Sequence, residues 1–202
     1  AYGLLCRTLN DLSELYLDAN KLAQAQPLLD RAKLIGEEWL ESTDPENIMV
    51  LKNLAFVTYR LGSFNQAKSI AEKLLAAQEN VYGSRHQEVG ISLELLAVIN
   101  QSQRRFDKAE LQFKRALSIM ESQTGAQSDA VARLLRKLAS LHCDKHDHVI
   151  AKPLLKRALA IRKSLRRSQD EEFASAYMQL AEVYYVESNY QPSELYYKKA
   201  LS

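Results

Sequence analysis

The chain has 202 residues, of which 47% are hydrophobic and 26% are charged, and its formal net charge is +2. This charge is too small to bind a polyanion by bulk attraction, and six glycines and four prolines are too few for a β-rich fold full of turns. No run of roughly 18 apolar residues is present to span a membrane. Cys6 and Cys143 are too few for a disulfide framework, which favours a reducing compartment, the cytoplasm.

The order of apolar and turn residues along the chain predicts pairs of helices joined by short turns. Asp44 is predicted to cap a helix that opens at Pro45, because this combination is typical of a helix N-terminus. Gly62 is predicted to end that helix as a C-cap glycine. First helices are expected near residues 4–18, 47–61, 88–102, 130–144 and 172–186. Second helices are expected near residues 22–39, 64–80, 106–123, 148–165 and 190–202.

These helix pairs recur with a period of 42 residues. One register holds small residues on the second helices, and an earlier one holds leucines on the first helices. Their members are Ala25, Ala67, Ala109, Ala151 and Ser193, and Leu12, Leu54, Leu96, Leu138 and Leu180. A small or nearly small residue follows each leucine, which leaves a notch where a second helix can approach closely. A bulkier residue at the small register would overpack the joint at a cost of about 1–3 kcal/mol. One pair alone leaves an apolar face open, so the pairs must stack.

The repeat resembles the tetratricopeptide repeat (TPR), and its period resembles that of the kinesin-light-chain-type subclass. The segment Tyr82-Gly83-Ser84-Arg85-His86-Gln87-Glu88-Val89 is similar to the inter-repeat loop of that subclass. The resemblance implies an all-α fold, a right-handed superhelical α-solenoid of five antiparallel helix pairs. It implies a single array over residues 1–202, expected to be a fragment of a longer protein, with repeats near 4–40, 47–81, 88–123, 130–165 and 172–202.

The resemblance also implies a protein–protein interaction scaffold or adaptor, with a concave groove, lined by first helices, that takes a peptide or partner segment. Apolar residues of repeats two and three are expected to face solvent there, flanked by basic residues. This combination suggests a partner with a hydrophobic anchor and acidic residues. The candidate groove residues are Met49, Lys52, Asn53, Phe56, Tyr59, Arg60, Ile91, Glu94, Val98, Arg133, Arg136, Lys137 and Ser140.

Other interpretations of these residues remain open. The apolar ones can instead pack against neighbouring first helices, and the basic ones can be ordinary solvated charges. The alternative function is a structural or regulatory arm of a larger protein, or self-association through the ends of the array. One TPR subclass clamps the C-terminal carboxylate of chaperones, but Phe56 and Leu95 stand at the two asparagine places of that clamp, so this function is not predicted.

No catalytic residue, cofactor or metal is predicted. His142, Cys143, His146 and His148 form a metal-like cluster, and His142 and His146 have a spacing that zinc can use. However, the three histidines stand at framework positions of the repeat, so substituted packing residues explain them better. Nucleic-acid binding is not predicted either, because the basic run Arg162-Lys163 and Arg166-Arg167 ends a second helix, where cations are favoured anyway.

Overall fold

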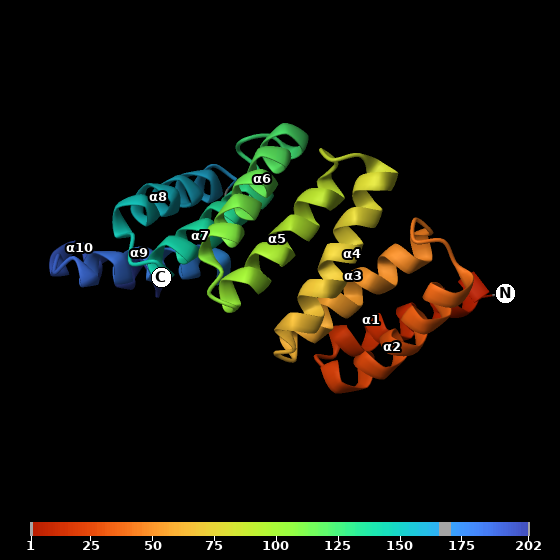
Figure 1. Cartoon of the computed structure of the whole chain (residues 1–202). Coiled ribbons are helices and arrows are strands. Elements are labelled where there is room, and N and C mark those ends of the chain that lie inside the picture. Colours follow the sequence, from red (N-terminus) through yellow and green to blue (C-terminus); the bar gives the residue numbers. More distant parts are fainter. Residues whose placement is uncertain (1, 166–170, 202) are drawn as a thin grey trace. The chain divides into compact units, whose positions relative to one another are not determined.

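The computed structural model describes residues 2–165 and 171–201, which form ten α-helices and no strand (Figure 1). The first helices are α1 (Tyr2–Asp18), α3 (Pro45–Arg60), α5 (Gln87–Ser102), α7 (Asp129–Asp144) and α9 (Glu171–Val186). The second helices are α2 (Leu22–Trp39), α4 (Phe64–Tyr82), α6 (Phe106–Thr124), α8 (His148–Ser164) and α10 (Tyr190–Ala200). The predicted helices are confirmed, with ends that agree to within two residues.

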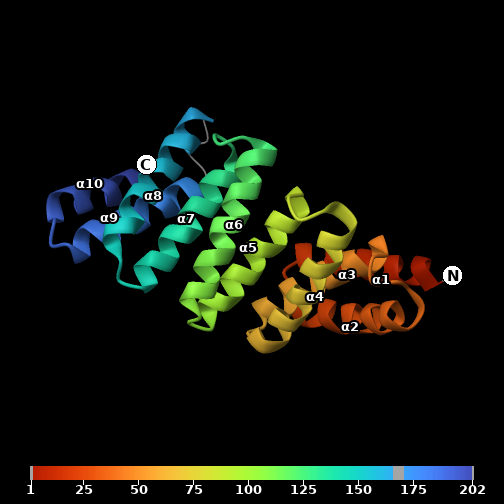
Figure 2. The ribbon, with the colours of Figure 1, turned by 45° about the horizontal axis from the view of Figure 1, so that its top comes forward.

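The helices fall into two compact units, Ala1–Arg105 with α1 to α5 and Phe106–Ser202 with α6 to α10. In unit 1, α1 packs on α2 and α3 on α4, and each second helix packs on the next first helix. Unit 2 repeats this arrangement from α6 to α10. First helices also contact one another, α1 with α3, α3 with α5, and α7 with α9. Within unit 1, Figures 1 and 2 show α1 and α3 as one layer and α2 and α4 as the other.

The turn inside each helix pair has the same conformation. One residue per turn adopts a positive φ between 54° and 80°, and its position recurs every 42 residues. These residues are Asn20, Gly62, Arg104, His146 and Ser188. A left-handed residue just after a helix ends it and turns the chain back, and glycine adopts this conformation most easily.

The loops between pairs cap the following first helices. Asp44 precedes Pro45, and its side chain accepts a hydrogen bond from the backbone N–H of Glu46 at 3.0 Å, which confirms the predicted N-cap. His86 and Ser128 occupy the equivalent places, and their side chains accept from backbone N–H groups of α5 and α7. Each cap pairs an otherwise unbonded donor of the first helical turn.

The two repeat registers form the core. The four alanines of the small register are fully buried, and the Ser193 hydroxyl donates to the backbone oxygen of Ala181 at 2.8 Å, so its polar group is paired. The leucines of the other register are buried in the later four repeats, whereas Leu12 is 41% exposed. Leu12 differs because no described helix covers that side of α1, as α2 covers Leu54 of α3.

Candidate functional site

The first helix α3 of unit 1 carries two exposed large apolar side chains. Met49 and Phe56 of α3 are 43% and 39% exposed. They are seven residues apart, two turns, so they lie on one face of the helix. Exposed large apolar groups that are aligned in this way offer contact area to a partner.

Polar side chains around this face are held by neighbours within unit 1. Lys52 Nζ lies 3.2 Å from the Glu88 carboxylate of α5. Asn53 Nδ2 donates to Asn10 Oδ1 and to Glu14 Oε1 of α1, both at 2.9 Å. These contacts tie α1, α3 and α5 together and orient the surface between them.

Arg60 completes the face at the C-terminal end of α3. Its guanidinium lies 5.5 Å from the centre of the Phe56 ring, and its Nη2 donates to Asn20 Oδ1 at 3.4 Å. A guanidinium over an aromatic face is attracted by the ring quadrupole. The ring is therefore held in place, and its exposed part remains available for contact.

The remaining predicted residues of unit 1 are less exposed than the sequence suggests. Tyr59, Ile91 and Val98 are only half-exposed, and Tyr59 packs against the core beside Phe64. Glu94 is 6% exposed, so the expectation that its side chain lies open in a groove is wrong. Helix α5 contacts both α3 and α4, and Glu94 is buried there beside Leu93.

Four predicted residues lie on α7 in unit 2 and are described separately from those of unit 1. Arg136 makes a bidentate contact with Glu172 of α9, with its Nε and Nη2 donating at 2.7 and 3.1 Å. Arg133, Lys137 and Ser140 are half-buried. The Arg136 guanidinium thus already holds a carboxylate, the group that an acidic partner would offer.

Arg162 is a charged residue whose environment the sequence did not reveal. The sequence explains it as a cation favoured at the end of a second helix, and the structure shows that it is 3% exposed. Its Nη2 lies 3.1 Å from Asp129 Oδ1 and 3.9 Å from Glu172 Oε2. The signal that could have found it is its register, because Gly36, Gln78 and Met120 at the equivalent positions are also buried. Arg166 and Arg167 lie outside the described residues.

The histidine cluster lies at the turn between α7 and α8. His142 is buried at the register of Tyr16 and Tyr184, and His146 is the left-handed residue of its turn. Burial raises the pKa of Cys143 to about 11, so its thiol is protonated at neutral pH. Among residues 2–165 and 171–201 no group of three or more His, Cys, Asp or Glu side chains could hold a metal ion.

Glu110 of α6 is the centre of a charged cluster beside this turn. Its carboxylate accepts hydrogen bonds from Lys114 Nζ at 2.7 Å and Lys145 Nζ at 2.8 Å. These bonds, that of Lys114 first, lower the pKa of Glu110 from 4.5 to about 2. His142 Nε2 lies 3.9 Å from the same carboxylate, and burial lowers the pKa of the imidazole.

Replacing Glu110 with glutamine should lower the free energy of unfolding by about 1 kcal/mol at neutral pH, because two lysines lose their shared carboxylate while solvent screens part of the loss. A carboxylate with a lowered folded-state pKa stabilises the fold above its unfolded pKa of 4.5 and loses this contribution as the pH falls toward about 2. Thermal unfolding at several pH values should show that the melting temperatures of the wild type and of Glu110→Gln approach each other as the pH falls from 4.5 to about 2. The exposed Glu194, replaced in the same way, should show no resolvable change, and a difference that persisted at low pH would contradict the prediction.

None of the described helices combines the length and apolar character needed to cross a membrane. The family model of the tetratricopeptide repeat matches residues 4–77, 44–122 and 130–202. These matches cover most of the sequence, so the chain belongs to the tetratricopeptide repeat family. A search of curated proteins finds no significant match.

Solved structures share this fold at low sequence identity. BtubC (BKLC) from P. vanneervenii has 24% identity and a TM-score of 0.83, covering 99% of this chain and 80% of that one. A kinesin-light-chain-like protein from Podosopora anserina, with nearly identical TPR-like repeats, has 20% identity and a TM-score of 0.82, covering 100% and 95%. Aspartyl phosphate phosphatase F from Bacillus subtilis has 16% identity and a TM-score of 0.82, covering 98% and 50%. At these identities the similarity shows the fold, including that of kinesin-light-chain-like repeats.

Proposed function

We propose that this chain is a protein-interaction scaffold that binds a peptide or partner segment on its first helices. The observation that supports this most is the exposed pair Met49 and Phe56 on α3. The family supports it in general, because tetratricopeptide repeat proteins are typically scaffolds without enzymatic activity. A cytoplasmic location is part of the same proposal, supported by two free cysteines.

The proposed partner contributes an apolar side chain to the surface of Met49 and Phe56. Apolar anchors that are desolvated at the centre of an interface supply most of its binding energy. An acidic residue beside that anchor would reach Lys52, which is 45% exposed, but it would have to compete with Glu88. The acidic part of the partner therefore contributes specificity more than affinity.

The α7 surface of unit 2 is proposed as a second surface that contacts a partner segment. Arg133, Arg136, Lys137 and Ser140 are half-buried there, so they offer limited area. Arg136 can accept a new carboxylate only by giving up part of its bidentate contact with Glu172. Substitutions in unit 2 should consequently weaken binding less than those at Phe56.

Replacing Phe56 with alanine should weaken partner binding at least about tenfold, because the anchor contact is lost while the core is untouched. Peptides selected from a random display library against the purified chain supply the ligands, and fluorescence anisotropy measures their affinities. Selected peptides are expected to carry an apolar residue whose replacement by alanine has a comparable effect.

The matched control is Leu34→Ala, which removes an exposed leucine from the second helix α2. It should leave the affinity unchanged, because it lies on the other helix layer. Circular dichroism should show the same helix content for both variants. The proposal is wrong if Phe56→Ala binds the selected peptides as tightly as the wild type, or if Leu34→Ala has the larger effect.

A further inference from the structure

Unit 1 contains a half-open pocket of about 410 Å³ that belongs to neither first-helix surface. It lies between the C-terminal parts of α2 and α4, above the N-terminal turns of α3. No Cα atoms of α2 and α4 come within 8 Å of each other, so the two second helices leave room between them. The apolar part of its wall is Leu40, Leu51, Ala76 and Ala77.

The pocket occurs where one repeat lacks a large core side chain. Ala77 is buried, and the residues at its register in the other second helices are Ile35, Ile119 and Ile161. Ile119 and Ile161 are buried, so this register normally fills the joint with an isoleucine. Alanine at this place leaves space for an apolar group of about that size.

A second departure from the repeat pattern lines the same pocket. Asn47 is buried, although Val89, Val131 and Phe173 at its register are apolar. Its Nδ2 donates to the backbone oxygen of Glu41 at 3.3 Å, but its Oδ1 has no hydrogen-bond partner within the described structure. A buried acceptor without a partner is costly unless something else supplies a donor.

Gly36 makes room for this amide. A Cβ atom added to Gly36 would lie 2.8 Å from Asn47 Oδ1, closer than real Cβ contacts allow. Asn47 and Ala77, which both differ from the residues at their registers in the other repeats, thus line one pocket. Gly36, which also differs from the residues at its register, makes room for Asn47. Packing alone would favour valine and isoleucine here, as at the other joints.

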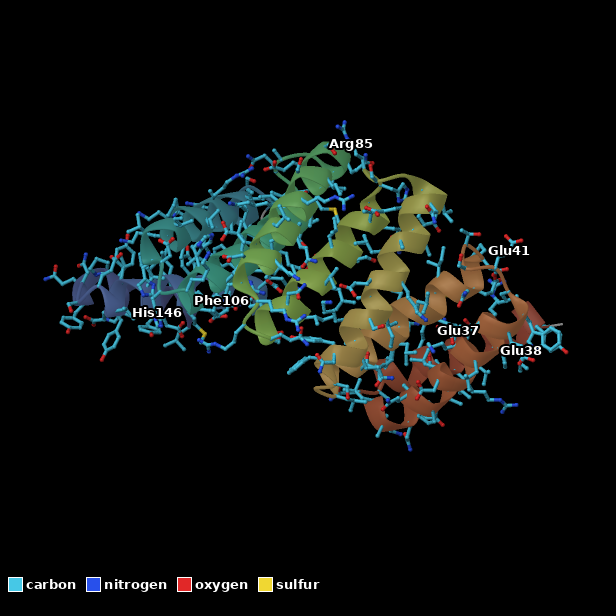
Figure 3. The ribbon with its side chains drawn as sticks, viewed as in Figure 1. Glu37, Glu38, Glu41, Arg85, Phe106 and His146 are labelled. Atoms are coloured by element: carbon cyan, nitrogen blue, oxygen red, sulfur yellow. The ribbon has the colours of Figure 1, made fainter. Side chains whose placement is uncertain are left out.

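Glu37 and Lys73 are the charged residues that line the pocket, and the end of α2 beside it with the start of the next loop, residues 33–41, carries more acidic than basic groups. Glu37 is bridged by Lys33 and Lys73, both at 2.9 Å, and the Lys33 bond is the largest cause of its lowered pKa. Glu38 and Glu41 have no ion-pair partner among the described residues. Figure 3 shows these three glutamates on the end of α2 and the loop that follows it. Three carboxylates against two ammonium groups favour a cationic neighbour.

We infer that this pocket takes an apolar side chain of a partner segment that carries a basic residue beside it. The side chain fills the space left by Ala77, and the basic residue meets Glu41, which stands between the lining residues Leu40 and Ser42. A rotation of the Asn47 amide toward the pocket lets Oδ1 accept a backbone N–H of the segment. This contact lies between second helices and so goes beyond the proposed first-helix surface.

Three capped tripeptides test the pocket, with the sequences Lys-Leu-Lys, Glu-Leu-Glu and Lys-Gly-Lys. Titration of the isotope-labelled chain followed by amide NMR shifts should give saturable changes at Ala76, Ala77 and Asn80 with Lys-Leu-Lys. The dissociation constant should be about fivefold weaker for Glu-Leu-Glu, and Lys-Gly-Lys should produce no saturable change. Equal shifts with all three peptides, or none with Lys-Leu-Lys, would overturn the inference.

Replacing Ala77 with isoleucine should fill the pocket and abolish the Lys-Leu-Lys shifts while raising the melting temperature by about 2–4 °C. The matched control is Ala160→Ile, an exposed position on α8, which should leave the peptide affinity unchanged. Asn47→Val should keep the pocket but weaken binding by about fivefold through the lost acceptor. Undiminished binding by Ala77→Ile would show that the peptide binds elsewhere and would refute the pocket, and undiminished binding by Asn47→Val would remove that residue from it.

Discussion

Replacing Leu54 with alanine should lower the free energy of unfolding by about 3 kcal/mol, within the range of roughly 2–5 kcal/mol for buried leucines. Leu54 is fully buried in the core of unit 1, where it fills the joint between repeats one and two. The surrounding helices cannot close the space fully, so both apolar burial and packing contacts are lost. Urea unfolding followed by circular dichroism measures the difference, with the melting temperature as a second readout.

Leu12→Ala is the matched control, because it is the same change at the same register of the repeat. Leu12 is 41% exposed and so should lose about 1 kcal/mol or less. The difference between the two losses measures how much a preceding second helix, packed on this leucine, adds to the free energy of unfolding. Equal losses at the two leucines would mean that stacking between pairs contributes little to the stability of this chain.

Replacing Arg162 with methionine should cost about 2–3 kcal/mol. Arg162 is buried, and its guanidinium lies between Asp129 of α7 and Glu172 of α9 in unit 2. Removing it leaves two partly solvated carboxylates without their shared cation, which is why the expected loss lies at or below the lower end of the range for buried ion pairs. Methionine occupies the equivalent buried position in α6, at Met120, so the shape of the site is retained. Calorimetry should show a melting temperature lower by about 5–10 °C.

Arg157→Met on the same helix separates this loss from a general effect of removing a charge. Arg157 also forms an ion pair, with Glu121, but its side chain is 43% exposed. Solvent screens such a pair, so the expected loss is about 0.5 kcal/mol or less. The prediction for Arg162 fails if its replacement costs no more than that of Arg157.

The repeat register predicts which residues of the candidate site lie on one face of a first helix. It does not predict which charged residues pair with them. The register places Met49 and Phe56 on one face of a first helix, and the structure leaves both exposed. The register also places Lys52 and Arg136 on first helices. Their ion-pair partners, Glu88 and Glu172, belong to the next first helix in each case. Both pairs have a sequence separation of 36 residues, as do Lys73 with Glu37 and Arg157 with Glu121. That recurring separation is the signal that could have identified the pairs in advance.

The sequence by itself determined the five helix pairs, their turns and the residues of the core. These properties repeat every 42 residues and depend on local spacing, since a small residue or a left-handed turn has the same effect in every repeat. Only the tertiary structure decided the properties of single joints. The burial of Glu94 and Arg162, the ion pairs between helices and the pocket beside Ala77 depend on which side chains meet across neighbouring helices. Such contacts differ from joint to joint, so a repeat pattern that averages over the joints cannot contain them.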